Sequence, residues 1–319
     1  METLDRAVIS KHSMAILLFM LFLAGCQTQD EEQGAESEAK SNRVVAASYA
    51  LQYLTERIAG ELVTVEFPAA DSDDPKNWSP SVAEVVAMQD ADLFVINGLG
   101  ARYAEWLTQV SIDESKLCNS VQNFQLNDYL KVNDYQIVHS HGPQGEHSHA
   151  YFVPYCWLDP NLASQQSAAI CESLCAVYPE FETEFRSNLK LLETDLGQLE
   201  EVTAEFRLAD KKPAICISPY LKIFARSLEL GDHHLLYFSA ADIKDLDELK
   251  ANLIREQKEA DASVVLTHFK LSPKIQECID QCGLQAIEID LLDKPGVDFI
   301  EAMKRNVEIL GRLRVGLPN

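Results

Sequence analysis

Apolar positions along the chain alternate between short continuous runs and longer stretches with helical spacing. The run Asp92-Leu93-Phe94-Val95-Ile96 has the composition of a strand that is buried on both faces. The stretch from Ser48 to Gly60 places apolar side chains at helical steps and ends on a glycine, which is a helix stop. The β-α-β-α-β order of such segments predicts a parallel sheet. Strands are predicted over 43–47, 63–67 and 92–96, and helices over 48–60, 81–91 and 101–110.

The stretch from Glu180 to Leu208 differs from everything before it. Its apolar residues recur at steps of three and four through eight positions. This spacing predicts one amphipathic helix of about 43 Å, long enough to act as a strut between two lobes. Two shorter helices broken near Gly197 are the alternative.

Strand and helix patterns alternate again after this helix. Strands are predicted over 213–218, 262–267 and 285–291, and helices over 220–230, 245–260, 274–282 and 298–314. The fold class predicted from the whole pattern is therefore α/β, with two parallel-sheet lobes joined by one long rigid helix.

The N-terminus has the features of a secretory signal. Residues 15–25 are apolar or small and follow Arg6 and Lys11, and the run is too short to span a bilayer comfortably. It ends at Leu23-Ala24-Gly25-Cys26, which resembles the lipobox of bacterial lipoproteins, where the signal is cut before the cysteine and the cysteine is acylated. A buried N-terminal helix with an incidental cysteine is the alternative.

Residues 27–42 carry five acidic residues and almost nothing apolar, so they cannot bury enough surface to fold. We interpret them as a tether between the lipid and the folded body, which places the protein on the extracytoplasmic (periplasmic) face of the cell envelope. The predicted organisation is a signal peptide at 1–25, lipidated Cys26 with the tether at 26–42, an N-terminal lobe at 43–178, the linking helix at 179–210 and a C-terminal lobe at 211–319.

Charge and motifs exclude several classes of function. The chain has 27 basic and 50 acidic residues, a net charge of −23, so it repels phosphate backbones and is not expected to bind nucleic acid. The sequence has no GxSxG, HExxH, Walker or dinucleotide-binding motif, and we expect no enzyme. The acidic surface suits a protein that attracts cations.

Cysteine and histidine residues supply the candidate chemistry. The pairs Cys171/Cys175 and Cys278/Cys282 have the i, i+4 spacing of one helix face, which fits either small buried side chains or half of a metal site. A loop holds four of the eight histidines, at 139, 141, 147 and 149, and such a loop chelates dications weakly or is simply solvated. The adjacent His233 and His234 lie in a connecting segment and are weak evidence of a site.

Several strings in a fixed order resemble the metal-specific solute-binding lipoproteins of bacterial ABC importers, the zinc and manganese uptake family. With the early strand and helix that precede them, they extend over about 270 residues. The strings are Asp74-Pro75-Lys76-Asn77-Trp78, Ala91-Asp92-Leu93, Asn97-Gly98-Leu99-Gly100, Trp106-Leu107, the His139–His149 loop, Tyr155-Cys156-Trp157-Leu158-Asp159-Pro160, Glu288-Ile289-Asp290 and Arg305-Asn306-Val307.

The resemblance implies a ligand cleft between the lobes that holds one metal, usually by three histidines and a carboxylate. This chain departs at the decisive positions. Lys76, Tyr155 and Ser218 stand where the family has histidine, and Asp290 alone is retained. His268 stands at a position that is acidic in some members of the family.

Two hypotheses follow for the cleft. In the first, a Lys76–Asp290 ion pair with the hydroxyls of Tyr155 and Ser218 replaces the metal. In the second, a relocated site uses His268 and Asp290 with a cysteine thiolate, for which Cys216 is preferred over Cys156, because the family residue before the tryptophan points away from the metal.

The function implied by the resemblance is extracytoplasmic binding of zinc or manganese, carried as the transported ligand and delivered to an ABC permease, with the protein held at the membrane through Cys26. The alternative is a relative with a metal-free cleft that binds metal weakly through the histidine loop or serves another envelope role.

Overall fold

The computed structural model describes residues 42–72, 75, 78–98, 106, 110–124, 131–140, 146–152 and 154–313, and for 131–140, 146–152, 312 and 313 it describes the backbone. The predicted signal peptide, Cys26 and the tether up to residue 41 lie outside this part of the chain and stay predictions. Within the described ranges, no helix combines the length and apolar character needed to cross a membrane.

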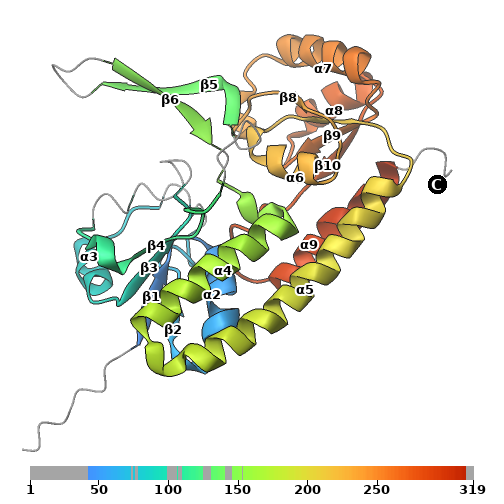
Figure 1. The fold of residues 1–319 in the computed structure, drawn as a ribbon. Helices are drawn as coiled ribbons and strands as arrows, with labels where there is room; N and C mark the ends of the chain where they lie inside the picture. Colours follow the sequence, from blue (N-terminus) through green and yellow to red (C-terminus); the bar gives the residue numbers. More distant parts are fainter. Residues whose placement is uncertain are drawn as a thin grey trace, which may run out of the picture. The chain divides into compact units, whose positions relative to one another are not determined.

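The N-terminal lobe is built on a parallel sheet of four strands in the order β2-β1-β3-β4 (Figure 1). The predicted strands are confirmed, and Val44, Val45 and Ala46 of the central strand are fully buried. The structure adds one strand at 117–119 that apolar patterning missed, because only Leu117 and Cys118 are apolar between polar neighbours on both sides. The strands are β1 (Arg43–Ala46), β2 (Thr64–Glu66), β3 (Leu93–Ile96) and β4 (Leu117–Asn119).

Local capping explains the helices of this lobe. Ser48 accepts a hydrogen bond from the Leu51 N–H at the start of α2 (Tyr49–Ala59), which ends at Gly60 with a φ of 60°. Ser81 and Glu84 form a reciprocal capping box on α3 (Val82–Gln89). The helix predicted over 101–110 falls mainly outside the described residues.

A two-stranded antiparallel ribbon replaces the expected histidine loop. Strand β5 (Lys131–Ser140) pairs with β6 (Glu146–Phe152), so three of the four histidines lie on strands rather than in a loop. The ribbon is followed by α4 (Pro160–Val177), whose N-cap Asp159 accepts from the N–H groups of Asn161 and Leu162.

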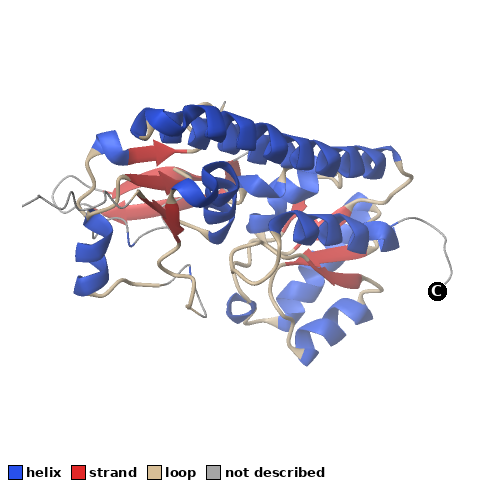
Figure 2. Ribbon diagram, turned by 90° about the horizontal axis from the view of Figure 1, so that it is seen from below, coloured by secondary structure: helices blue, strands red, loops and turns tan. Residues whose placement is uncertain are grey.

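The predicted strut is confirmed as one helix, α5 (Glu182–Leu208), of 27 residues, which continues unbroken through Gly197. A short 3-10 turn, η7 (Pro179–Phe181), leads into it. One stripe of the helix is buried and α5 packs beside α4 and α9 (Figures 1 and 2), so tertiary packing rather than intrinsic propensity stabilises it. The stripe comprises Phe185, Leu192, Leu196, Leu199, Thr203 and Phe206.

The C-terminal lobe has a second parallel sheet, in the order β10-β9-β7-β8. His233 and His234, which we expected in a connecting segment, form the edge strand β8 and pair with Ile215 and Cys216. The strands are β7 (Ala214–Cys216), β8 (His233–His234), β9 (Val264–Thr267) and β10 (Gln285–Glu288), and the helices are α6 (Lys222–Ser227), α7 (Leu246–Ala260) and α8 (Pro273–Gln281).

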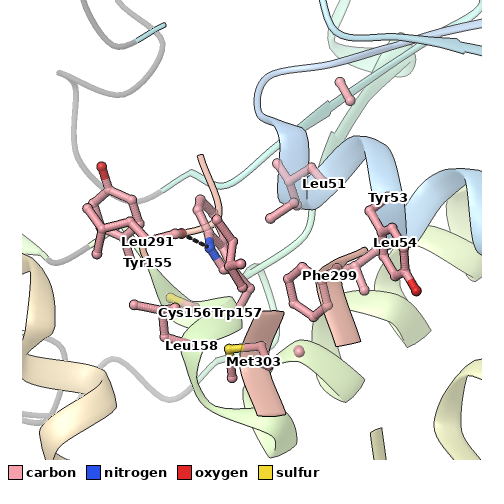
Figure 3. Close-up of a cluster of buried hydrophobic side chains, with 14 of the residues drawn as sticks. Leu51, Tyr53, Leu54, Tyr155, Cys156, Trp157, Leu158, Leu291, Phe299 and Met303 are labelled. Carbon is pink, nitrogen blue, oxygen red and sulfur yellow. Dashed lines mark hydrogen bonds between the residues drawn. The ribbon is translucent and has the colours of Figure 1, made fainter. Parts of the chain in front are cut away.

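The last helix, α9 (Phe299–Glu308), continues as the 3-10 turn η10 (Ile309–Leu313) and packs against the N-terminal lobe. Phe299 stacks on Tyr53 of α2 with 5.2 Å between ring centroids, and the Tyr53 hydroxyl donates to Asp298 at 3.1 Å. One apolar core therefore includes residues of both lobes (Figure 3). The domain boundaries inferred from the sequence stay predictions.

Candidate functional site at the junction of the two lobes

In each sheet the chain adds strands first on one side and then on the other, so the strand order reverses at one point. The chain leaves β1 for β2 on one side, and it leaves β3 for β4 on the other. In the second sheet β7 leads to β8, and β9 leads to β10 on the opposite side. Ligands of open parallel sheets bind at the carboxyl ends of such strand pairs. The residues that follow β1, β3, β7 and β9 are therefore the topological candidates.

The segment Pro154–Leu158 connects these two sets of strand ends. Asn97, which follows β3, donates from its amide nitrogen to the Pro154 carbonyl. Trp157 donates from its indole nitrogen to the carbonyl of Leu291 at 2.9 Å, so it joins the segment to the chain after β10 (Figure 3). We call this region the junction.

Tyr155 lies in the middle of the junction and is fully buried. Its ring centroid is 5.3 Å from that of Trp157 and 5.0 Å from that of Tyr220. At the position where the resemblance implies an imidazole ligand, the chain thus packs a phenol ring against two other rings. Edge and tilted contacts of this kind stabilise an aromatic cluster.

Ser218 is also buried, and its hydroxyl oxygen has a structural partner. It forms the N-cap of the 3-10 turn η8 (Pro219–Leu221) and accepts from the Tyr220 N–H at 3.2 Å. This cap orients the turn that presents the Tyr220 ring to Tyr155.

His268 follows β9 and is half-buried beside the same aromatic cluster. Its ring centroid lies 5.2 Å from that of Tyr220 and 5.0 Å from that of Phe269. Tyr155, Tyr220 and His268 therefore form one row of rings that starts in the N-terminal lobe and ends in the C-terminal lobe.

Asp290 is exposed, and its backbone N–H and carbonyl are both hydrogen-bonded to one side chain. Asn306 of α9 donates to the Asp290 carbonyl at 2.7 Å and accepts from the Asp290 N–H at 3.0 Å. One carboxylate oxygen accepts from the N–H of Leu292 at 2.8 Å. Leu292 has a φ of 58°, a left-handed conformation that is costly for a leucine. The carboxylate therefore stabilises a strained turn directly beside the junction.

The structure brings some of the sequence-predicted residues together. Tyr155 and His268 both contact Tyr220, whose turn Ser218 caps, and Asp290 is joined to the junction through Leu291 and Trp157. Lys76 lies outside the described residues, so the Lys76–Asp290 pair stays a prediction. Among the side chains that the structure describes, no group of three His, Cys, Asp or Glu is placed to hold a metal ion.

The cysteine ligands of the relocated-site hypothesis are deeply buried. Cys216 lies fully inside β7, and burial raises the pKa of its thiol to about 12. Burial raises the pKa of the Cys156 thiol as well. Since a metal binds the thiolate, both environments disfavour a cysteine ligand. The seven described cysteines are free thiols, and Cys171 and Cys175 lie with their sulfurs 4.0 Å apart in the core of α4.

The ribbon places three histidines on one face. His139 is directly opposite His147, and Ile137 is opposite His149. Residues opposite each other in an antiparallel pair share a face, and so do residues two apart on one strand. His139, His147 and His149 therefore occupy register positions on one face of the ribbon, while His141 lies outside the described residues.

Two junction residues, Tyr220 and Trp157, were not among the sequence-predicted site residues. Trp157 lies in the family-like string Tyr155–Pro160, but the sequence assigned it no role. Tyr220 was indicated only by its position two residues after Ser218. Only the spatial meeting of the strand ends identifies their function in joining the lobes.

Two parallel-sheet lobes, a single long helix beside them and a junction at the reversal points of both sheets define the class of bilobal solute-binding proteins. The family model described as zinc-uptake complex component A, periplasmic, matches residues 44–312. The chain belongs to this family, which consists of solute-binding transport proteins and not of enzymes.

Relatives agree with this membership. The chain is 27% identical over 190 residues to the zinc-binding lipoprotein AdcA of Streptococcus pneumoniae, a match that covers 59% of this chain and 36% of AdcA. It is 25% identical over 189 residues to the manganese-binding lipoprotein MntA of Halalkalibacterium halodurans, covering 59% and 57%. The matches thus span about a third to three fifths of these relatives.

Solved structures share the fold. The Zn(II)-bound ZnuA-like domain of Streptococcus pneumoniae AdcA superposes with a TM-score of 0.67 at 20% sequence identity. The superposition covers 86% of this chain and 98% of that domain. The confirmed fold class therefore extends over nearly all of the folded body.

Proposed function

We propose that this protein is an extracytoplasmic solute-binding lipoprotein of a metal-type ABC importer, anchored through Cys26, which binds a zinc or manganese ion and delivers it to a permease. The single observation that carries the proposal is the family match over residues 44–312. We infer zinc or manganese as the ion because AdcA is named a zinc-binding lipoprotein and MntA a manganese-binding lipoprotein.

We infer that the ion is first held by the β5–β6 ribbon. His139, His147 and His149 stand at register positions that share one face of the ribbon. Imidazole suits zinc and other borderline cations better than the hard cations that prefer oxygen. The net charge of −23 concentrates cations near the surface and favours this capture.

A second candidate for the junction is that it works without a bound metal. Buried Tyr155 packs on two rings, the Ser218 oxygen caps a turn and Asp290 supports a strained turn, so three of the four family positions have structural duties. In this candidate, Lys76 and Asp290 form the ion pair that replaces the metal, and the aromatic row holds the lobes together.

Metal analysis of protein purified without a histidine tag separates these candidates. One variant carries His139→Gln, His147→Gln and His149→Gln, a second carries His268→Gln and Asp290→Asn, and His233→Gln is the matched control outside both sites. Metal that is lost only in the ribbon variant supports capture by the ribbon with a metal-free junction. Metal that is lost only in the junction variant supports the family mode of binding. Absence of zinc and manganese from the wild-type protein, even after titration, contradicts the proposed function.

A further inference from the structure

Two cysteines of α4 lie close enough to share one ligand. Cys171 and Cys175 are one helical turn apart, and their sulfur atoms are 4.0 Å from each other. Both are free thiols. Cys171 is fully buried and Cys175 is 8% exposed, so the pair lies just below the surface. The spacing and the side-chain orientations therefore bring two potential thiolate ligands together.

The second pair of cysteines shows that this convergence does not follow from sequence spacing alone. Cys278 of α8 and Cys282 at its C-cap have the same i, i+4 separation. The Cys278 sulfur donates instead to the carbonyl of Leu246 at 3.6 Å. Buried cysteines often serve only as small apolar side chains, and what distinguishes Cys171 and Cys175 is the direct contact of their sulfurs.

Helix geometry disfavours a disulfide between Cys171 and Cys175. Residues four apart on a helix hold their Cβ atoms about 5–6 Å apart. A disulfide requires the two Cβ atoms to lie about 3.5–4.5 Å apart, so closing it would distort α4, which continues to Val177. The two thiols therefore remain available to a ligand that spans the distance between the sulfurs.

The distance between the sulfurs fits a single metal ion. Bonds between zinc and cysteine sulfur are about 2.3 Å long, so two thiolates on an ion of this kind lie at most about 4.6 Å apart. The observed 4.0 Å is within this limit. Among the side chains that the structure describes, no third His, Cys, Asp or Glu is placed to complete a larger ligand set. The pair therefore suits a cation that accepts two ligands.

Sulfur ligands and low coordination select the class of ion. Thiolates favour Cu(I), whereas zinc sites have four ligands and manganese prefers oxygen. We propose that Cys171 and Cys175 form a separate metal site, which binds one soft monovalent cation, Cu(I), between the two sulfurs. Binding releases both thiol protons, forms two copper–sulfur bonds and transfers no electron, so the product carries one negative charge.

Arg186 of α5 supplies a positive charge beside this product. Burial is the largest effect on both thiols and raises their pKa, and the Arg186 guanidinium lowers the pKa of both. Cys175 further raises the pKa of Cys171, and a cation between the sulfurs opposes this effect. The environment differs from that of Cys216, where burial and Asp232 both raise the pKa of the thiol.

The pair is accessible from the surface through side-chain motion. Cys175 keeps a small exposed area, and the Arg186 side chain is 43% exposed. Arg186 contacts Glu172 of α4 at 2.7 Å and Glu182 of α5 at 2.8 Å. Exposed ion pairs of this kind contribute little stability, and exposed side chains change rotamer within nanoseconds. The two carboxylates also attract a cation to this end of α4.

Competition titration with Cu(I) tests this site separately from zinc and manganese transport. The chelator-treated, reduced protein competes with bicinchoninate, whose coloured Cu(I) complex fades as the protein takes the ion. We expect the wild type to take one equivalent more than the double variant Cys171→Ala, Cys175→Ala. The matched control is Cys278→Ala with Cys282→Ala, which removes the other pair of the same spacing and should take as much Cu(I) as the wild type.

X-ray absorption on the unsubstituted protein covers the case in which the Cys171→Ala, Cys175→Ala variant does not fold. With one equivalent of Cu(I), the spectrum should show two sulfur neighbours of copper. Nitrogen or oxygen neighbours alone, equal uptake by the two double variants, or no uptake against bicinchoninate would each overturn the proposal. A Cys171–Cys175 disulfide found by mass spectrometry in the air-exposed protein would contradict it as well.

Zinc and manganese titrations of the same two double variants separate this inference from the proposed function. Both variants should bind these metals as the wild type does, because the ribbon and the junction are unchanged. Loss of zinc or manganese binding in Cys171→Ala, Cys175→Ala alone would show that the thiols belong to the transported-metal site, and it would overturn the assignment of a separate Cu(I) site.

Discussion

At the scale of single residues, the departures from the family pattern have physical consequences that can be followed in the packing. Tyr155 fills its position with a buried ring. The hydroxyl oxygen of Ser218 accepts the hydrogen bond that caps the turn containing Tyr220. Asp290 keeps the family identity but uses a carboxylate oxygen to stabilise Leu292 in a left-handed conformation. A retained residue can thus have a structural duty at a position where a resemblance implies a ligand.

His234 should make the protein less stable in mild acid. Its pKa is lowered from 6.5 to about 4 in the folded state, so the unfolded chain binds the proton first as the pH falls. The stability that comes from keeping the ring neutral is fully present above pH 6.5 and is lost between about 6.5 and 4, by at most about 3 kcal/mol. Urea unfolding at pH 7 and pH 4.5 measures this loss.

The variant His234→Gln isolates the contribution of this ring from that of the carboxylates. Its stability should fall less than that of the wild type over the same pH interval. An equal fall in both proteins would show that the titration of His234 is not responsible.

At the scale of elements, helix α5 shows how a repeated apolar stripe overrides a local weakness. Gly197 is exposed in the middle of the helix, and an added Cβ would meet no atom within 4 Å. The helix continues through it because Leu192, Leu196 and Leu199 on either side are buried. Packing of the stripe therefore outweighs the glycine.

Gly197→Ala should stabilise the protein by about 0.5–1 kcal/mol, because alanine loses less backbone entropy than glycine in a helix. Equilibrium unfolding in urea is the measurement. Gly98→Ala is the opposite control, since Gly98 has a φ of 66° and a Cβ there would clash with the side chain of Asn119. A destabilised Gly197→Ala protein would indicate that α5 bends or breaks at this residue.

The pairing register of β5 and β6 leads to a second prediction at the scale of elements. Ile137 lies opposite His149 and on the same face as His139, so Ile137→His should complete a block of four imidazoles. Zinc affinity should rise on the order of tenfold, equivalent to about 1.4 kcal/mol. Val138→His, on the other face, should leave the affinity measured by zinc titration unchanged. Equal gains in the two variants would mean that the register of the ribbon is different in solution.

At the scale of the whole molecule, the junction decides whether the fold binds metal in the family manner. The row Tyr155–Tyr220–His268 joins the two lobes by ring contacts, and the Trp157–Leu291 hydrogen bond adds a polar link. These contacts join the two lobes through protein groups.

Restoring the family ligands should restore a metal site. The combined change Lys76→His, Tyr155→His and Ser218→His would supply three imidazoles beside Asp290, and the zinc affinity of the junction should rise above that of the wild-type protein. Calorimetry on a background without the ribbon histidines measures it, with circular dichroism to show that the variant folds. The double variant without Lys76→His is the control and should bind more weakly. No gain in zinc affinity would mean that the four positions do not converge.

Much of the fold could be predicted from the sequence, because buried parallel strands and a long amphipathic helix leave strong periodic signals. Strands 43–47 and 92–96 and the helix around Gly197 are examples. The elements that were missed have weak local signals. Strand β4 is three residues long, β8 is only two, and the polar strands β5 and β6 have the composition of a loop.

The sequence by itself determined the fold class, the lipobox prediction and the family, since these depend on order and spacing along the chain. Only the tertiary structure decided which residues meet: that three histidines share a ribbon face, that α9 packs on α2, and that Nε2 of His234 is buried without a donor in the described part of the chain. The physical reason is that pairing register, burial and hydrogen-bond partners are set by segments far apart in the chain, and no local pattern records them.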